Sequence, residues 1–135
     1  MKTLSKTDFI HYLRCPDSLW LEKNKPDKYK RGVLSVFLSK LIKEGYEVEE
    51  YAKKLFPNGV EVSRNSGIDK TKVLLNENHE VLFQPSFKTS SGAFAIIDVL
   101  KKVDDDTYHI YEVKSSTSVK TDKMHNHLKD VCFQK

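Results

Sequence analysis

The chain has 135 residues, of which 39% are hydrophobic, and this is enough to bury the core of one domain. It has no run of about 20 apolar residues, which argues against a membrane span or a membrane partner, and its start lacks the apolar segment of a signal peptide. Two cysteines exclude a disulfide framework, and a net charge of +4 suits a polyanionic partner without requiring one. We therefore expect a single domain over residues 1–135, located in the cytoplasm.

The first half of the chain predicts helices. Ser5 precedes Asp8 by three residues, which is the spacing of a capping box, and Pro16 is expected to divide the segment that follows into two short helices. Tyr12 and Trp20 lie at helical spacing and are expected in the core. A longer helix is predicted from residue 30 to residue 56, because apolar or small residues recur there at helical intervals: Leu34, Leu38, Leu41, Gly45, Val48, Ala52 and Leu55.

The second half predicts strands. Residues 81–89, 93–103 and 107–116 are strand-like runs separated by Ser-Ser-Gly and Asp-Asp-Asp turns, and one or two helical turns are expected around residues 73–75. A last helix is predicted from about residue 121 to the end. The order indicates an α/β or α+β fold, in which helices flank a mixed sheet with a central antiparallel hairpin and a helical segment comes first.

Two carboxylates are expected to face each other on this hairpin. If Asp104 to Asp106 form its tip, Asp98 lies directly opposite Glu112, and Lys114 projects from the same face two residues further on. Like charges in this position destabilise a strand pair unless a cation lies between them. Mg²⁺ or Mn²⁺ would resolve the conflict, with the backbone carbonyl of Val113 as a further ligand and Lys114 beside the attacking water.

A plainer interpretation is that Glu112 and Lys114 form a surface ion pair in a structural domain, since Glu-x-Lys is common by chance. Asp98 argues against it, because this residue is a single charge inside a seven-residue apolar run, where an unpaired carboxylate would cost several kcal/mol. The two interpretations differ on whether Asp98 is exposed. A shift of the hairpin register by one residue would separate the pair.

The segments IIDVL, YEVKSSTSVK and HLKDVCFQ, together with LSKTDFIHYLRCPDSLWL at the start, resemble the PD-(D/E)XK nuclease superfamily. The closest resemblance is to its RecB-like and Cas4-like branch, in the group of bacterial proteins called DUF2779. The resemblance covers nearly the whole chain. It implies a restriction-endonuclease-like core that cleaves DNA, single- or double-stranded, with Asp98 and Glu112 holding the metal and Lys114 assisting the water.

Two further site residues follow from this resemblance. The family pattern G-x-x-x-[E/H] on the long helix matches Gly45 and Glu49, and a helical wheel independently places Glu49 about 40° from Gly45, on the apolar face, with Glu47 and Glu50 pointing away. An equally open alternative is that Glu49 is a boundary residue that reaches solvent. The family's Q-x-x-x-Y motif matches Gln134, which would support the water or the phosphate.

The departures from the family pattern favour an alternative function. The tyrosine of Q-x-x-x-Y would lie beyond Lys135, so we expect a fragment of a longer protein with additional domains, and Ala95 stands where the family usually has glycine. A catalytically inactive module that binds nucleic acid or scaffolds a larger protein is therefore the second hypothesis.

Other polar residues carry weaker signals. Cys15 matches one ligand of the iron–sulfur cluster of Cas4-like relatives, but Cys132 is the only other cysteine, so no cluster is expected and Cys15 is predicted to be a buried structural residue. His125 and His127 point to different sides of a helix and are expected on the surface. Four lysines are candidates for phosphate contacts, although a solvated charged surface explains them equally well: Lys114, Lys120, Lys123 and Lys129.

Overall fold

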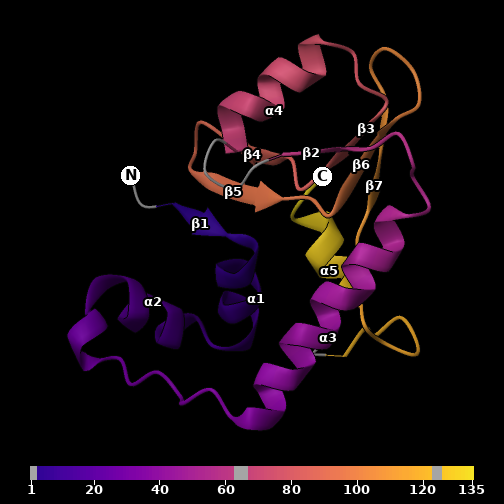
Figure 1. Cartoon of the computed structure of the whole chain (residues 1–135). Coiled ribbons are helices and arrows are strands. Elements are labelled where there is room, and N and C mark those ends of the chain that lie inside the picture. The colour runs from indigo at the N-terminus through magenta and orange to yellow at the C-terminus, as the bar shows by residue number, and fades with distance from the viewer. Residues whose placement is uncertain (1–2, 63–66, 123–125) are drawn as a thin grey trace.

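The computed structural model describes residues 3–62, 67–122 and 126–135, which form a mixed α+β fold with two mixed sheets (Figure 1). The first elements are β1 (Leu4–Ser5), α1 (Lys6–Arg14), α2 (Pro16–Asn24) and the 3-10 helix η1 (Pro26–Lys28). Both sides of the predicted capping box are formed, since Asp8 N donates to Ser5 Oγ at 3.2 Å and Ser5 N donates to Asp8 Oδ2 at 2.8 Å. Pro16 begins the second helix, as its fixed φ angle predicts.

Three side chains expected in the core are not buried. Cys15 is exposed, and Tyr12 and Trp20 retain 53% and 56% of their accessible surface. The reason is that α1 and α2 pack mainly on each other, and two helices of nine residues each have little surface to cover three more side chains. Leu19 is the one residue of α2 that reaches the core.

The long helix α3 (Val36–Lys53) begins and ends inside the predicted range. Ser35 caps it by accepting a hydrogen bond from Leu38 N at 3.1 Å. Every residue from 30 to 43 is exposed, while partly buried positions appear only from residue 44 onward. The N-terminal half of α3 accordingly extends away from the sheets, and its C-terminal half lies beside them (Figure 1).

The sheets consist of β1–β5–β4 and β2–β3–β6–β7, and α4 (Gly67–Asn76) is longer than the one or two turns predicted. The strands are β2 (Val60–Glu61), β3 (Val81–Phe83), β4 (Ser86–Lys88), β5 (Ala93–Ile96), β6 (Val99–Lys102) and β7 (Tyr108–Tyr111). Two of the predicted strands are each divided in two. β3 pairs with β6, and β4 pairs with β5, in one continuous register. At the break, Gln84 therefore lies opposite Asp98, and Pro85 lies opposite Ile97. Pro85 has no N–H to donate, and Gln84 has a positive φ of 56°. Together these two residues end the regular ladder.

The core lies on both sides of β3. Val62, Leu74 and Leu82 form one buried cluster, and Val81, Phe83 and Val99 form another, against which Phe56 packs. In the described ranges, no helix combines the length and the apolar composition that crossing a membrane requires.

The last helix, α5 (His127–Cys132), is shorter than predicted, because Thr121 instead pairs with Asn126 in an isolated bridge. Asn126 then caps the helix by accepting from Lys129 N at 2.9 Å. His127 is partly buried rather than on the surface, and its Nδ1 accepts from Lys120 N at 3.1 Å. The predictions for Lys123 and His125 fall outside the described residues.

Replacing Gly59 by Ala should destabilise the protein. A Cβ at this position would lie 2.1 Å from Cζ of Phe83, whose ring is 6% exposed and fixed in the core. We expect a loss of about 1–3 kcal/mol in the free energy of unfolding, measured by urea denaturation. Gly45→Ala is the matched control: its Cβ would meet nothing within 4 Å, and alanine should gain up to about 1 kcal/mol in the helix. Equal stability of the two variants would contradict the close approach at Gly59.

Candidate metal and phosphodiester site

The hairpin register that the sequence predicts is formed. β6 and β7 pair from Val99 opposite Tyr111 to Lys102 opposite Tyr108, and the next positions on this ladder are Asp98 and Glu112. Asp98 lies where the chain passes from β5, in one sheet, to β6, in the other. The break in the ladder therefore places this carboxylate between the two sheets.

Asp98 is partly buried, and among the described residues one backbone donor contacts its carboxylate. Its Oδ2 accepts a hydrogen bond from Val113 N at 2.8 Å. Burial is the largest cause that raises the pKa of Asp98, the charge of Glu112 is the next, and together they move it from 3.8 to about 6. The site thus holds more negative charge around Asp98 than the described groups compensate.

Glu112 is the more deeply buried carboxylate, with a side chain that is 5% exposed. Its Oε1 accepts from Lys6 Nζ at 2.8 Å and from Lys114 Nζ at 2.6 Å, and its Oε2 accepts from Gln134 Nε2 at 2.6 Å. Burial alone would raise the pKa of Glu112, but the hydrogen bonds from Gln134, Lys114 and Lys6 lower it to about 2. Glu112 is therefore ionised at every physiological pH.

Lys114 lies between two carboxylates. Besides Glu112, it donates to Asp130 Oδ2 at 2.5 Å, and Asp130 is a buried residue of α5. Burial would lower the pKa of Lys114, but these two hydrogen bonds raise it. Lys114 is thus held as an ammonium group at a fixed position beside Glu112.

Glu49 faces the sheet, whereas Glu47 and Glu50 are exposed, as the helical wheel predicts. Gln84 Nε2 donates to Glu49 Oε1, and Gln84 lies opposite Asp98 in the broken ladder. Glu49 and Asp98 both line a surface depression of about 470 Å³, which we call the acidic hollow. Its other lining residues include Ser5, Lys6, Tyr46 and Gln84. Glu49 and Asp98 therefore open onto the same space, and Glu112 is not part of its lining.

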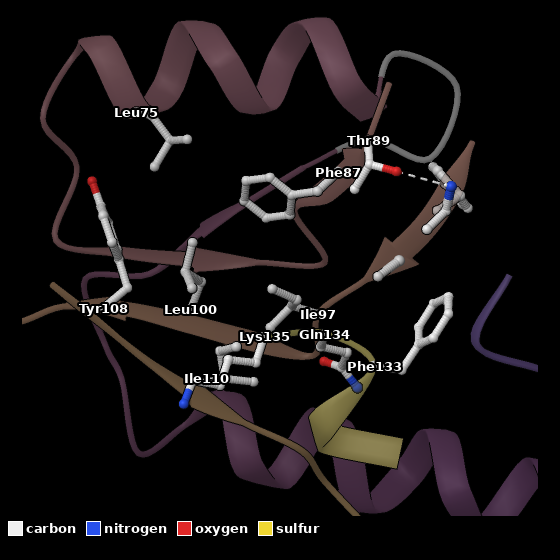
Figure 2. Close-up of a pocket in the computed structure, with 13 residues that line it drawn as sticks. Leu75, Phe87, Thr89, Ile97, Leu100, Tyr108, Ile110, Phe133, Gln134 and Lys135 are labelled. Carbon is white, nitrogen blue, oxygen red and sulfur yellow. Dashed lines mark hydrogen bonds between the residues drawn. The ribbon is translucent and has the colours of Figure 1, made fainter. Parts of the chain in front are cut away.

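Gln134 lies behind Glu112 rather than in the acidic hollow. Its amide nitrogen donates to Glu112 and, at 3.3 Å, to the carbonyl of Asp130, while its Oε1 is buried without a hydrogen-bond partner among the described residues. Gln134 also lines a separate apolar cavity of about 420 Å³, with Phe87, Leu100 and Ile110 around it (Figure 2). This placement makes Gln134 a group that positions Glu112, with no access to the acidic hollow.

Three residues of the site were not predicted from the sequence: Lys6, Gln84 and Asp130. Asp130 and Gln134 are four residues apart in the segment predicted to be the last helix, so a polar pair at this helical spacing could have indicated them. Gln84 is a polar residue in an apolar run before a proline, which is a similar signal to that of Asp98. Nothing in the sequence indicates that Lys6 reaches Glu112, because the contact joins residues 106 positions apart.

The metal ligands expected from the sequence do not converge into a ready-made cage. In residues 3–62, 67–122 and 126–135, no three side chains of His, Cys, Asp or Glu form a group that could hold an ion. Asp98 is nevertheless influenced by the charges of both Glu112 and Glu49, so the three carboxylates share one region. The ammonium groups of Lys6 and Lys114 occupy the space next to Glu112.

No known protein family, curated protein or solved structure matches this chain.

Proposed function

We propose that the domain is a nuclease of restriction-endonuclease-like architecture that hydrolyses phosphodiester bonds in DNA with Mg²⁺ or Mn²⁺. The observation that supports this most is the pair of carboxylates Asp98 and Glu112, which occupy the opposed positions directly beyond the paired ends of β6 and β7. The raised pKa of Asp98 is a direct consequence of burial and of the Glu112 charge, and a divalent cation would remove this cost.

The donor set has the chemistry that Mg²⁺ or Mn²⁺ prefers. Carboxylate oxygens of Asp98, Glu112 and Glu49 and the backbone carbonyl of Val113 are hard oxygen ligands from one region of the fold, and such an ion keeps water and phosphate oxygens in its other positions. When bound, the ion would activate a water molecule and neutralise charge on the phosphate. Gln84 and Gln134 each donate to one of these carboxylates, which fixes Glu49 and Glu112 in place.

Lys114 would act as a charged donor. Because its pKa is raised, it orients the attacking water or a phosphate oxygen and offsets the charge that develops there, and it does not take a proton. In the hydrolysis, the water oxygen bonds to phosphorus, the bond from phosphorus to the leaving sugar oxygen breaks, and that oxygen acquires a proton. Lys120 and Lys129 are exposed and remain candidates for phosphate contacts.

One observation favours the alternative, an inactive nuclease-fold module. Glu112 is already neutralised by Lys6 and Lys114, so this carboxylate is stable without a metal. Cleavage of labelled single- and double-stranded DNA in Mn²⁺, Mg²⁺ or EDTA separates the two functions. Metal-dependent cutting supports the nuclease, whereas DNA binding without cutting, and without any rise in melting temperature on addition of metal, supports the module.

Lys114→Met should lower the cleavage rate by about 10²- to 10⁴-fold while the protein stays folded and still binds metal. The side chain of methionine keeps the length of the lysine stem but removes the ammonium group that contacts Glu112 and Asp130. The measurement is the single-turnover rate in Mn²⁺, with circular dichroism as the check on folding. Lys88→Met, at an exposed position at the end of β4, is the matched control, and an equal loss in both variants would contradict the role of Lys114.

A further inference from the structure

Three polar side chains of the N-terminal helices form a hydrogen-bonded chain that includes no residue of the carboxylate site. His11 Nε2 lies 2.9 Å from Ser18 Oγ, and His11 Nδ1 lies 3.1 Å from Glu22 Oε2. His11 belongs to α1, whereas Ser18 and Glu22 are four residues apart on α2. The packing of α1 against α2 therefore aligns a hydroxyl group, an imidazole and a carboxylate.

The chemistry of these groups determines the direction of both hydrogen bonds. A carboxylate only accepts, so the contact with Glu22 requires a proton on His11 Nδ1. In the neutral imidazole, Nε2 then carries no proton and accepts a hydrogen bond from Ser18 Oγ. His11 is thus placed as a base toward the Ser18 hydroxyl, and this arrangement activates a serine as a nucleophile.

Neighbouring residues hold the carboxylate and the imidazole in position. Glu22 Oε1 lies 2.9 Å from Arg31 Nη2, while Oε2 of the same group faces His11. The ring centroids of Tyr29 and His11 are 6.0 Å apart. The side chains of His11 and Glu22 remain 22% and 18% exposed, and Ser18 is also partly exposed. All three groups are therefore accessible from solvent.

Ser18 also lies in the first turn of a helix. It is the third residue of α2, which begins at Pro16 and has no side-chain cap. The first backbone hydrogen bond there runs from Leu19 N to the carbonyl of Cys15, at 3.2 Å. The N–H groups of Asp17 and Ser18 thus have no acceptor inside the helix. Such groups, at the positive end of the helix dipole, stabilise the negative oxygen that forms when a nucleophile attacks a carbonyl.

We propose that Ser18 is the nucleophile of a second active centre, which hydrolyses small carboxylic esters, with His11 as its base and Glu22 as the residue that positions His11. Small esters are the class that fits, because the serine is partly exposed between two helices of nine residues each. The inference does not depend on the proposed nuclease function, and it uses none of the residues named there.

The reaction proceeds through an acyl-serine. Ser18 Oγ bonds to the carbonyl carbon of the ester while its proton passes to His11 Nε2. The bond from this carbon to the alcohol oxygen then breaks, and the alcohol leaves with the proton. Water attacks the acyl-serine and gives a proton to His11. The carboxylic acid is released as this proton returns to Ser18 Oγ.

An alkyl fluorophosphonate tests the nucleophile directly, because an activated serine displaces its fluoride and keeps the phosphonyl group. Mass spectrometry of the labelled wild type should find one phosphonyl group and place it on Ser18. Ser18→Ala should lose the label, and His11→Gln should slow labelling by about 10²-fold or more, with circular dichroism as the check on folding. Ser39→Ala is the matched control and should label like the wild type, since Ser39 is an exposed helix serine whose hydroxyl donates to the Ser35 carbonyl at 3.1 Å.

Two further measurements test the acyl-serine and the role of Glu22. With p-nitrophenyl acetate, the wild type should release about one p-nitrophenolate per protein molecule in a rapid first phase, which Ser18→Ala should lack. In Glu22→Gln, the nitrogen-15 spectrum of His11 should lose the preference for a proton on Nδ1, because glutamine can also donate to this nitrogen. A residue that only supported the fold would not change the tautomer.

A wild-type protein that takes up no label, or takes it up at another residue, would overturn the proposal. Equal labelling rates of the wild type and a folded His11→Gln would remove His11 as the base. If the His11 variant does not fold, the label and the rapid phase in Ser18→Ala decide the outcome. DNA cleavage by Ser18→Ala should proceed at the wild-type rate, so the two activities are tested separately.

Discussion

Glu112→Gln should lower DNA cleavage by about a thousandfold or more, which corresponds to about 4 kcal/mol of transition-state stabilisation. The substitution keeps the size of the side chain and a possible contact with Gln134, but removes the charge that a metal would bind. A second result should accompany it in the metal-free protein. The charge of Glu112 is one cause of the raised pKa of Asp98, so the pKa of Asp98 should fall toward its ordinary value in the variant.

These two results are measured independently, the first as a cleavage rate in Mn²⁺ and the second as an NMR titration of the Asp98 carboxyl carbon. Glu77→Gln is the matched control, because that side chain is 52% exposed in the turn that follows α4 and lies outside the site. A variant that cuts DNA at the wild-type rate would remove Glu112 from the catalytic site. An unchanged Asp98 titration would show that the two carboxylates do not interact.

The sequence allowed the most accurate predictions where local rules dominate. The three-aspartate turn fixes the register of the hairpin, which is why the positions of Asp98 and Glu112 could be predicted. The capping box of Ser5 and the helix start at Pro16 are also local, and both are formed. In each of these cases, the deciding interaction joins residues that are close in sequence.

The predictions that failed, and the site residues that were missed, depend on contacts between segments that are far apart in the sequence. The regular spacing of Leu34, Leu38 and Leu41 predicts an apolar helix face but not which element covers it. These residues remain 56%, 45% and 43% exposed, and Leu34 precedes the start of α3. The breaks between β3 and β4 and between β5 and β6 depend on how two strands bend together. Lys6 joins the site through a contact across nearly the whole chain, which no local pattern encodes.

Asp98→Asn should abolish cleavage and at the same time stabilise the metal-free protein at neutral pH. Asparagine can still accept the hydrogen bond from Val113 N, but it carries no charge beside Glu112. In the wild type, the pKa of Asp98 is about 6 in the folded state against 3.8 as its ordinary value, a difference that corresponds to about 3 kcal/mol at most. We expect a gain of about 2 kcal/mol in the free energy of unfolding at pH 8, measured by urea denaturation.

The pH dependence gives the sign of this effect. Because the folded state holds the Asp98 proton more tightly than the unfolded chain, the wild type loses stability as the pH rises from 3.8 to about 6, and the loss is complete above that range. The advantage of the variant should therefore be small below pH 4 and largest above pH 6. Protonation of Glu112 at lower pH destabilises both proteins and cancels in the comparison.

Adding Mg²⁺ should reverse the order of stability, since a ligand that binds only the folded state stabilises it, and only the wild type retains the carboxylate. Asp105→Asn, at a side chain that is 100% exposed in the hairpin turn, is the control and should be unaffected by pH or metal in this way. If Asp98→Asn proved less stable than the wild type at pH 8 without metal, the carboxylate would be fully compensated by protein groups. The excess negative charge from which the metal site is inferred would then not exist.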